Sequence, residues 1–106
     1  GTNERFARAT FTRATIVDHP DNSTIFDEIV AGRADLMVTD AIETRWQAAQ
    51  NPGVLCAVHP DAPFTASEKA YLTPAGDPAF TERVNTWLRT ARTDGTWDRL
   101  ARPWLG

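Results

Sequence analysis

Apolar residues along the chain follow two alternating patterns, one with helical spacing and one of short continuous runs. Helical spacing predicts five helices, at 3–11, 25–30, 42–49, 80–91 and 97–104. Between them lie short apolar runs that predict strands, at 14–17, 36–38, 54–58 and 69–73. Helices that alternate with short strands are typical of βαβ units. The pattern therefore predicts an α/β fold with a mostly parallel sheet and flanking helices.

Turn-forming residues separate several of these segments. Gly32 follows the second helix at a C-cap position, Asn51-Pro52-Gly53 ends the third, and Asp94-Gly95 divides the last two. The chain opens directly on a predicted helix, with no strand in front of it. Because a strand normally feeds each helix of a βαβ unit, we expect the first strand and a neighbouring domain to lie upstream.

Length and charge narrow the classes of function. The 106 residues are 42% apolar and 24% charged, with a net charge of −3, which suits a folded chain with a single core. No basic stripe supports nucleic-acid binding or anionic membranes, and no apolar run approaches the ~20 residues of a membrane helix. The single cysteine, Cys56, excludes an internal disulfide and lies in an apolar run, so we expect it to be a buried small residue.

The tripeptide His-Pro-Asp occurs twice, at 19–21 and 59–61, each time after a predicted strand. Histidine and aspartate can bind metals, but no third and fourth ligand lies at helical or hairpin spacing. A turn in which proline fixes the backbone explains both copies better. We therefore expect no metal site.

Polar residues at two predicted helix starts are candidate ligand contacts. Thr2 and Asn3 open the first helix, where free amides and the helix dipole favour a carboxylate, although either residue also suits a simple N-cap. Asp40 follows the strand at 36–38, at the sheet edge where open α/β folds bind ligands. It can meet a ligand ammonium or hydroxyl, or cap the next helix, or do both.

Glu68 stands where the chain leaves a proline-rich loop for the apolar run at 69–73. An isolated glutamate is usually a solvated surface group. Buried in a cleft beside a substrate carboxylate, it would have a raised pKa and could act as a general acid. The surrounding residues do not decide between the two.

The order of the motifs carries a resemblance to a known superfamily. A start of the form Gly-Thr-x-Glu-x-Phe is followed by a β-branched strand, a helix ending in Gly-Arg-Ala-Asp, and an apolar strand ending in Asp40. The tail contains three further motifs, at 84–88, 94–97 and 103–106. Together they resemble the second lobe and C-terminal end of type II periplasmic solute-binding proteins of the polar amino-acid type.

Within that superfamily the chain is most similar to the cyclohexadienyl dehydratase family. The similarity lies in five stretches, at 1–8, 19–22, 34–43, 55–60 and 68–72. Ordinary binding proteins tend to carry an aromatic residue where this chain has Glu68. The exchange of an aromatic residue for an acid favours catalysis over transport.

The resemblance implies a reaction in which prephenate gives phenylpyruvate, or arogenate gives phenylalanine, by loss of water and carbon dioxide. Glu68 would be the general acid, and Thr2 and Asn3 would hold a substrate carboxylate. Asp40 matches the acid that grips the α-ammonium of amino-acid ligands. No metal or organic cofactor is implied. The alternative is an amino-acid-binding periplasmic receptor, whose partner would be the permease of an ABC importer.

The family pattern also implies a division of the chain and a partner. Residues 1–66 would form the second lobe without its first strand, and residues 67–106 would be a hinge strand and helices that return to the first lobe. Since the chain lacks that first lobe, we expect the missing lobe or another chain to complete the fold. We also expect a periplasmic location, and no activity from the 106 residues alone.

Overall fold

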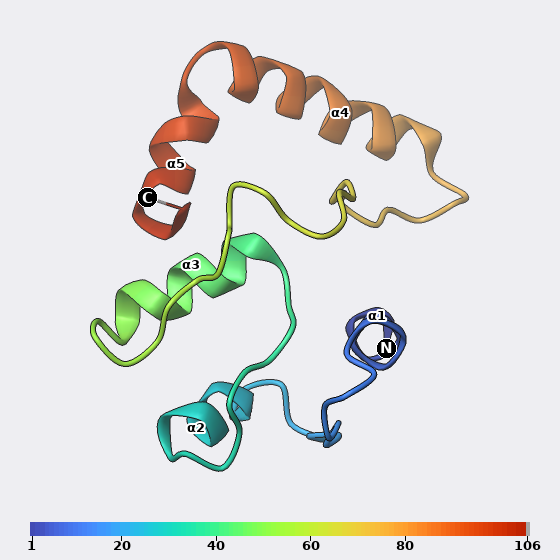
Figure 1. Cartoon of the computed structure of the whole chain (residues 1–106). Coiled ribbons are helices and arrows are strands. Elements are labelled where there is room, and N and C mark those ends of the chain that lie inside the picture. Colours follow the sequence, from blue (N-terminus) through green and yellow to red (C-terminus); the bar gives the residue numbers. More distant parts are fainter. Residues whose placement is uncertain (106) are drawn as a thin grey trace. The chain divides into compact units, whose positions relative to one another are not determined.

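The computed structural model describes residues 1–105, which contain five α-helices (Figure 1). Their bounds lie within two residues of the helices predicted from apolar spacing: α1 Thr2–Thr10, α2 Ile25–Val30, α3 Ala41–Gln50, α4 Pro78–Thr93 and α5 Thr96–Leu105. None of these described helices has both the length and the apolar character needed to cross a membrane.

The predicted α/β lobe with a parallel sheet is wrong, because residues 1–105 contain no β-strand. The four runs predicted as strands are irregular segments, and several of their apolar side chains are exposed, as Val17 (80%) and Leu72 (100%) show. Strand propensity favours extended backbone, but a strand is stabilised only by pairing and by burial of its faces. Among residues 1–105 these runs have no pairing strand, and their side chains are at most half-buried.

The chain divides into two compact units, Gly1–Pro63 and a second that begins at Phe64. The first unit contains α1, α2 and α3, and the second contains α4 and α5. The predicted assignment of residues 1–66 and 67–106 to different lobes stays a prediction, because the internal contacts of a unit do not reveal its partner.

Local backbone chemistry explains where α2 ends. Gly32 has a φ of 75°, which a residue without Cβ adopts at little cost. The amide of Gly32 donates to the Ile29 carbonyl at 3.0 Å, and that of Arg33 donates to the Glu28 carbonyl at 2.8 Å. These two bonds form a Schellman motif, which satisfies carbonyls that the helix end leaves free. The role predicted for Gly32 is confirmed.

The Arg33 side chain reinforces the same helix end. Its guanidinium donates two hydrogen bonds to the Glu28 carboxylate, at 2.9 and 2.8 Å. The hydrogen bonds from Arg33 lower the pKa of Glu28 below its usual value of 4.5. This ion pair therefore stabilises the helix end fully above pH 4.5. The stabilisation is lost as the pH falls through the lowered pKa of Glu28.

We expect Glu28→Gln to lower the hydrogen-exchange protection of the Gly32 and Arg33 amides at neutral pH. The difference from the parent should disappear well below pH 4.5, where Glu28 itself is protonated. Asp35→Asn removes a carboxylate that forms no ion pair within residues 1–105. This variant should leave the exchange protection of both amides unchanged. A difference that persists in acid would show that the carboxylate charge is not responsible.

The second unit is built on α4 and α5, which pack against each other (Figure 1). Asp77 caps α4 by accepting a hydrogen bond from the Phe80 amide at 3.0 Å, and Pro78 occupies the first turn, where its missing N–H costs nothing. Gly95, with a φ of 82°, separates the two helices as predicted. Asp94 accepts a hydrogen bond from the Thr96 amide at 2.9 Å and so supports the start of α5.

Very little of the chain is buried. Among the described residues only Phe26 and Ala91 are buried apolar side chains, at 8% and 2% exposure. The chain exposes 8863 Å². One compact monomer of this mass would expose about 5,900 Å², and two separate compact units of these sizes would expose about 7,100 Å². The surplus means that much apolar surface lacks the cover that a folded domain normally provides.

Both units carry this uncovered apolar surface, so the surplus is not confined to one segment. The residues concerned are large and at least 38% exposed: Val17, Val30, Leu36, Ile42, Val54, Val58, Phe64, Tyr71, Leu72, Phe80, Trp87, Trp97, Leu100 and Trp104. So many exposed large apolar side chains are typical of surfaces that contact other protein.

Candidate functional site

The start of α1 leaves several backbone amides of the first unit without a helical partner. The first bond of the helical type runs from the Arg5 amide to the Gly1 carbonyl, at 3.1 Å. The amides of Thr2, Asn3 and Glu4 therefore lie in the first turn, where a helix has no carbonyl to offer them. All three residues are exposed. With the positive end of the helix dipole, this turn can receive a carboxylate.

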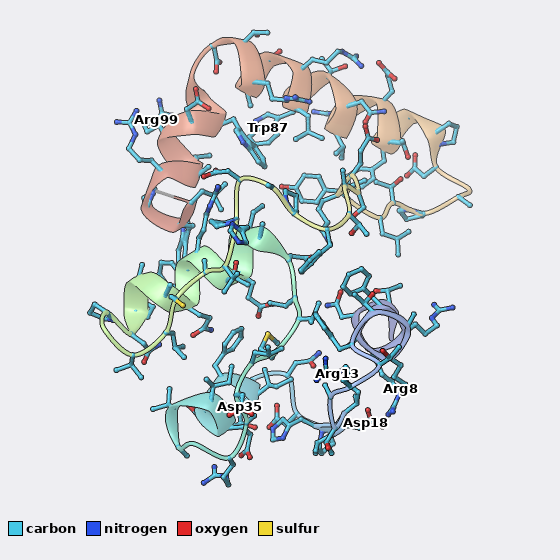
Figure 2. The ribbon with its side chains drawn as sticks, viewed as in Figure 1. Arg8, Arg13, Asp18, Asp35, Trp87 and Arg99 are labelled. Atoms are coloured by element: carbon cyan, nitrogen blue, oxygen red, sulfur yellow. The ribbon has the colours of Figure 1, made fainter. Side chains whose placement is uncertain are left out.

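Three charged side chains, two on α1 and one beyond it, form a hydrogen-bonded network. Arg8 donates from Nε to Oε1 of Glu4 at 3.0 Å, and from Nη2 to both carboxylate oxygens of Asp18, at 2.9 and 3.0 Å (Figure 2). Hydrogen bonding to Glu4 and the charge of Asp18 raise the pKa of Arg8. Hydrogen bonds from the Gly1 amine and from Arg8 lower the pKa of Glu4.

Arg8 and Asp18 were not among the candidates from sequence. The spacing of Glu4 and Arg8, four residues apart on one helix, is the signal that could have found half of the network. Asp18 is ten residues from Arg8 and lies beyond the turn that follows α1. No periodicity connects the two, so this contact had to come from the structure.

Asp40 occupies the N-cap position of α3, in extended backbone at φ −66° and ψ 143°. Its carbonyl accepts the first helical bond, from the Thr44 amide at 3.0 Å, but its side chain makes no capping hydrogen bond. The residue is exposed. The side chain of Asp40 therefore does not cap α3.

Glu68 lies in the second unit, in the irregular segment before α4, and is exposed. Within residues 1–105 it has no hydrogen-bond or ion-pair partner. Thr2, Asn3 and Asp40 belong to the first unit. Thr2 and Asn3 share one helix turn, whereas the prediction that all four residues meet in one site stays a prediction.

The second His-Pro-Asp copy forms a turn, as predicted, and the first leads into a turn that begins at Asp21, although no strand within residues 1–105 precedes either copy. Asp21 accepts hydrogen bonds from the Ser23 amide and hydroxyl, at 2.9 and 2.6 Å, which lower its pKa. In the second copy the amide of Ala62 donates to the His59 carbonyl at 2.9 Å. Across residues 1–105 no three histidine, cysteine or acidic side chains gather as metal ligands would.

One smaller prediction in the first unit is wrong. Cys56 is exposed, because the run at 54–58 is an irregular surface segment and not a buried strand. Thr24 lies at the N-cap of α2 but does not cap it. Its hydroxyl lies 2.8 Å from Nε2 of His19, so a side-chain partner takes the place of the helix amides.

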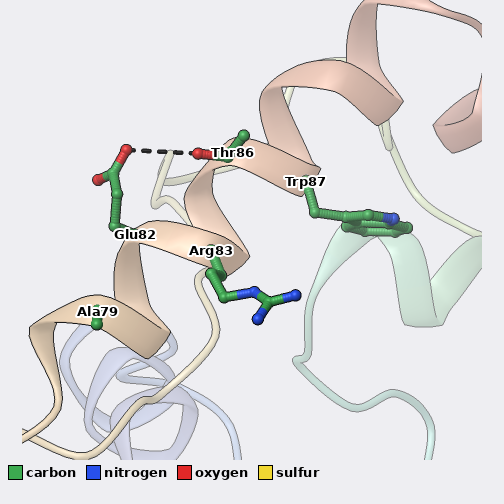
Figure 3. A pocket seen from close by; sticks show the side chains of 5 residues that line it. All are labelled: Ala79, Glu82, Arg83, Thr86 and Trp87. Carbon is green, nitrogen blue, oxygen red and sulfur yellow. Dashed lines mark hydrogen bonds between the residues drawn. The ribbon is translucent and has the colours of Figure 1, made fainter.

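A shallow hollow lies on one face of α4 (Figure 3). It is open to solvent and is lined by residues at helical spacing: Ala79, Glu82, Arg83, Thr86 and Trp87. The carboxylate of Glu82 is already bonded to Thr86 at 3.4 Å and to Arg89 at 2.8 Å. Because one helix face supplies the whole lining, the hollow cannot enclose a ligand within this unit.

Similarity to a known protein extends along almost the whole chain. No family model matches it. A cyclohexadienyl dehydratase from Pseudomonas aeruginosa (strain PAO1) is 53% identical over 105 residues, which is 99% of this chain and 38% of that protein. The chain thus spans about two fifths of the length of the curated relative that it matches. The chain is therefore similar to one segment of a cyclohexadienyl dehydratase, which confirms the resemblance of its motifs.

Proposed function

We propose that this chain supplies part of a cyclohexadienyl dehydratase, which converts prephenate to phenylpyruvate, or arogenate to phenylalanine. The observation that carries the proposal is the 53% identity over 105 residues. The similarity runs through both units, and so includes the α1 start, Asp40 and Glu68 together. The phenylalanine-forming reaction belongs to biosynthesis, and we place it in the periplasm on the resemblance alone.

The proposed chemistry needs one acid. Protonation of the ring hydroxyl by Glu68 lets it leave as water when the C–O bond breaks. The bond between the ring and its carboxylate also breaks, and carbon dioxide departs. The electron pair of that bond stays with the ring and completes its aromatic system. Glu68 ends the step as a carboxylate and regains its proton from solvent. Neither a metal nor an organic cofactor has a step to perform.

The first unit would hold the substrate. The amides and side chains of Thr2 and Asn3 suit a carboxylate, because the helix start is positive and open. Asp40, whose side chain does not cap α3, suits the α-ammonium of arogenate. Prephenate carries a keto group at that position, so Asp40 has no ion pair to form with it.

The proposed enzyme requires more polypeptide than these residues. A general acid must be kept from bulk water to hold a proton near neutral pH, and Glu68 is exposed. The apolar surface of both units also needs cover. We propose that a further segment or another chain covers Glu68 and this surface, in keeping with the 62% of the relative that lies outside the match.

Measurements of binding and turnover distinguish the two candidate functions. In a chimera, this chain replaces the matching segment of the Pseudomonas relative. We expect calorimetric titration with prephenate to give a sustained heat of reaction and phenylpyruvate as product. A panel of amino acids should give weak binding or none. Tight amino-acid binding without turnover would instead support the receptor of an ABC importer, with its permease as partner.

Asp40→Asn should distinguish the two substrates. In the chimera we expect it to raise KM for arogenate by about tenfold, the typical loss for a hydrogen bond to a charged group. KM for prephenate should not rise, because the keto acid offers no ammonium and the variant removes only a negative charge that repels it. Asp35→Asn serves as the matched control, since Asp35 forms no ion pair within the described residues. Equal changes for both substrates would refute the ammonium contact.

A further inference from the structure

Arg8 connects α1 to the segment that follows it. No residue of α1 is fully buried, so packing alone holds its direction weakly. Arg8 bonds backwards to Glu4, one turn earlier, and forwards to Asp18, beyond the next turn (Figure 2). A guanidinium has several donors in a fixed plane, so it can hold two carboxylates at once. The direction of the α1 start therefore depends on a contact near the far end of that helix.

The bond between Arg8 and Glu4 also changes the charge at the start of α1. The Glu4 carboxylate lies in the first turn of α1, where it stabilises the helix but repels an anion that approaches Thr2 and Asn3. The guanidinium of Arg8 bonds directly to that carboxylate and offsets its charge. The three charged side chains are between 43% and 64% exposed, so each interaction is screened and modest.

We propose that Arg8 and Asp18 are positioning residues for the helix start that receives the substrate carboxylate, an inference that rests on the proposed function. Asp18 fixes the guanidinium of Arg8 through both of its oxygens. Arg8 in turn fixes the first turn of α1 and offsets Glu4. Neither residue touches the substrate or takes part in proton transfer.

The test is a split between KM and kcat in the chimera with prephenate. We expect Arg8→Gln to raise KM about three- to fivefold, the size of effect typical of a networked surface ion pair, with kcat little changed. Asp18→Asn is the decisive variant, because removing a negative charge would by itself attract the anionic substrate and lower KM. The positioning role predicts a rise instead. The double variant should be no worse than Arg8→Gln alone.

Arg13→Gln and Asp35→Asn make the same charge changes nearby (Figure 2). Neither Arg13 nor Asp35 forms an ion pair within residues 1–105, so these variants report the effect of the charge change alone. Asp35→Asn should therefore not raise KM, and Arg13→Gln should raise it less than Arg8→Gln does. A KM for Asp18→Asn at or below the parent value, or equal shifts in the controls, would overturn the positioning role. A chimera without any turnover would instead overturn the proposed function, and this inference with it. Circular dichroism of each variant confirms that the helices are intact.

Discussion

Glu68→Gln is expected to lower kcat of the chimera for prephenate by a factor of about 10²–10⁴, the usual contribution of a general acid. Glutamine keeps the shape and hydrogen-bonding reach of glutamate but has no proton to give to the departing hydroxyl. KM should change little, because Thr2 and Asn3 hold the substrate carboxylate independently of this side chain. Stopped or continuous measurement of phenylpyruvate formation gives both constants.

The matched control for this variant is Asp98→Asn. Asp98 is an exposed acid of the same unit, in the first turn of α5, and it has no ion pair within the described residues. Its replacement should leave kcat unchanged. If Glu68→Gln retains the parent kcat, the acid lies elsewhere, and the exchange of an aromatic residue for Glu68 has no catalytic meaning.

Phe26→Ala should have the largest effect on stability. Phe26 is the one large side chain that the first unit buries among its described residues, and a buried phenylalanine truncated to alanine typically costs about 3–5 kcal/mol. That cost approaches the whole stability of a small domain. We therefore expect the amides of α2 to lose their hydrogen-exchange protection while those of α4 in the second unit keep theirs.

Val30→Ala, on the same helix, is the comparison. Val30 is 48% exposed, and surface substitutions usually change the free energy of unfolding by about 0.5 kcal/mol or less. Exchange protection in α2 should therefore stay near the parent value. Similar losses for both variants would show that α2 is held by its own propensity and not by the burial of Phe26.

The helices could be predicted because their signals are local. Apolar spacing locates all five in residues 1–105, and single residues such as Gly32 and Gly95 mark their ends through backbone geometry. Each signal acts within a few residues, so the sequence around it is sufficient. The bounds consequently agree to within two residues.

The sheet could not be predicted reliably because strand formation is not local. Val17 and Leu72 belong to runs with strand-like composition, yet both are exposed in irregular backbone. A run becomes a strand only when another strand pairs with it and its faces are covered. Cys56 follows the same rule, since its predicted burial depended on a strand that does not form.

The residues of the candidate site also differ in how far local sequence signals could identify them. Thr2, Asn3 and Asp40 could be found because helix starts are visible in sequence, and the structure places them at the first turn of α1 and the N-cap of α3. The acid role of Glu68 came from family resemblance and not from its neighbours, and it awaits the kinetic test above. The contact of Arg8 with Asp18 has no sequence signal at all.

The rate of phenylpyruvate formation from prephenate by the chimera tests the central claim most directly. If this chain is a working segment of a dehydratase, kcat/KM should lie within about tenfold of the unmodified Pseudomonas relative assayed alongside, a difference of about 1.4 kcal/mol in transition-state stabilisation. A chimera with the helix content and melting temperature of the relative, but with phenylpyruvate appearing only at the uncatalysed rate, would contradict the account.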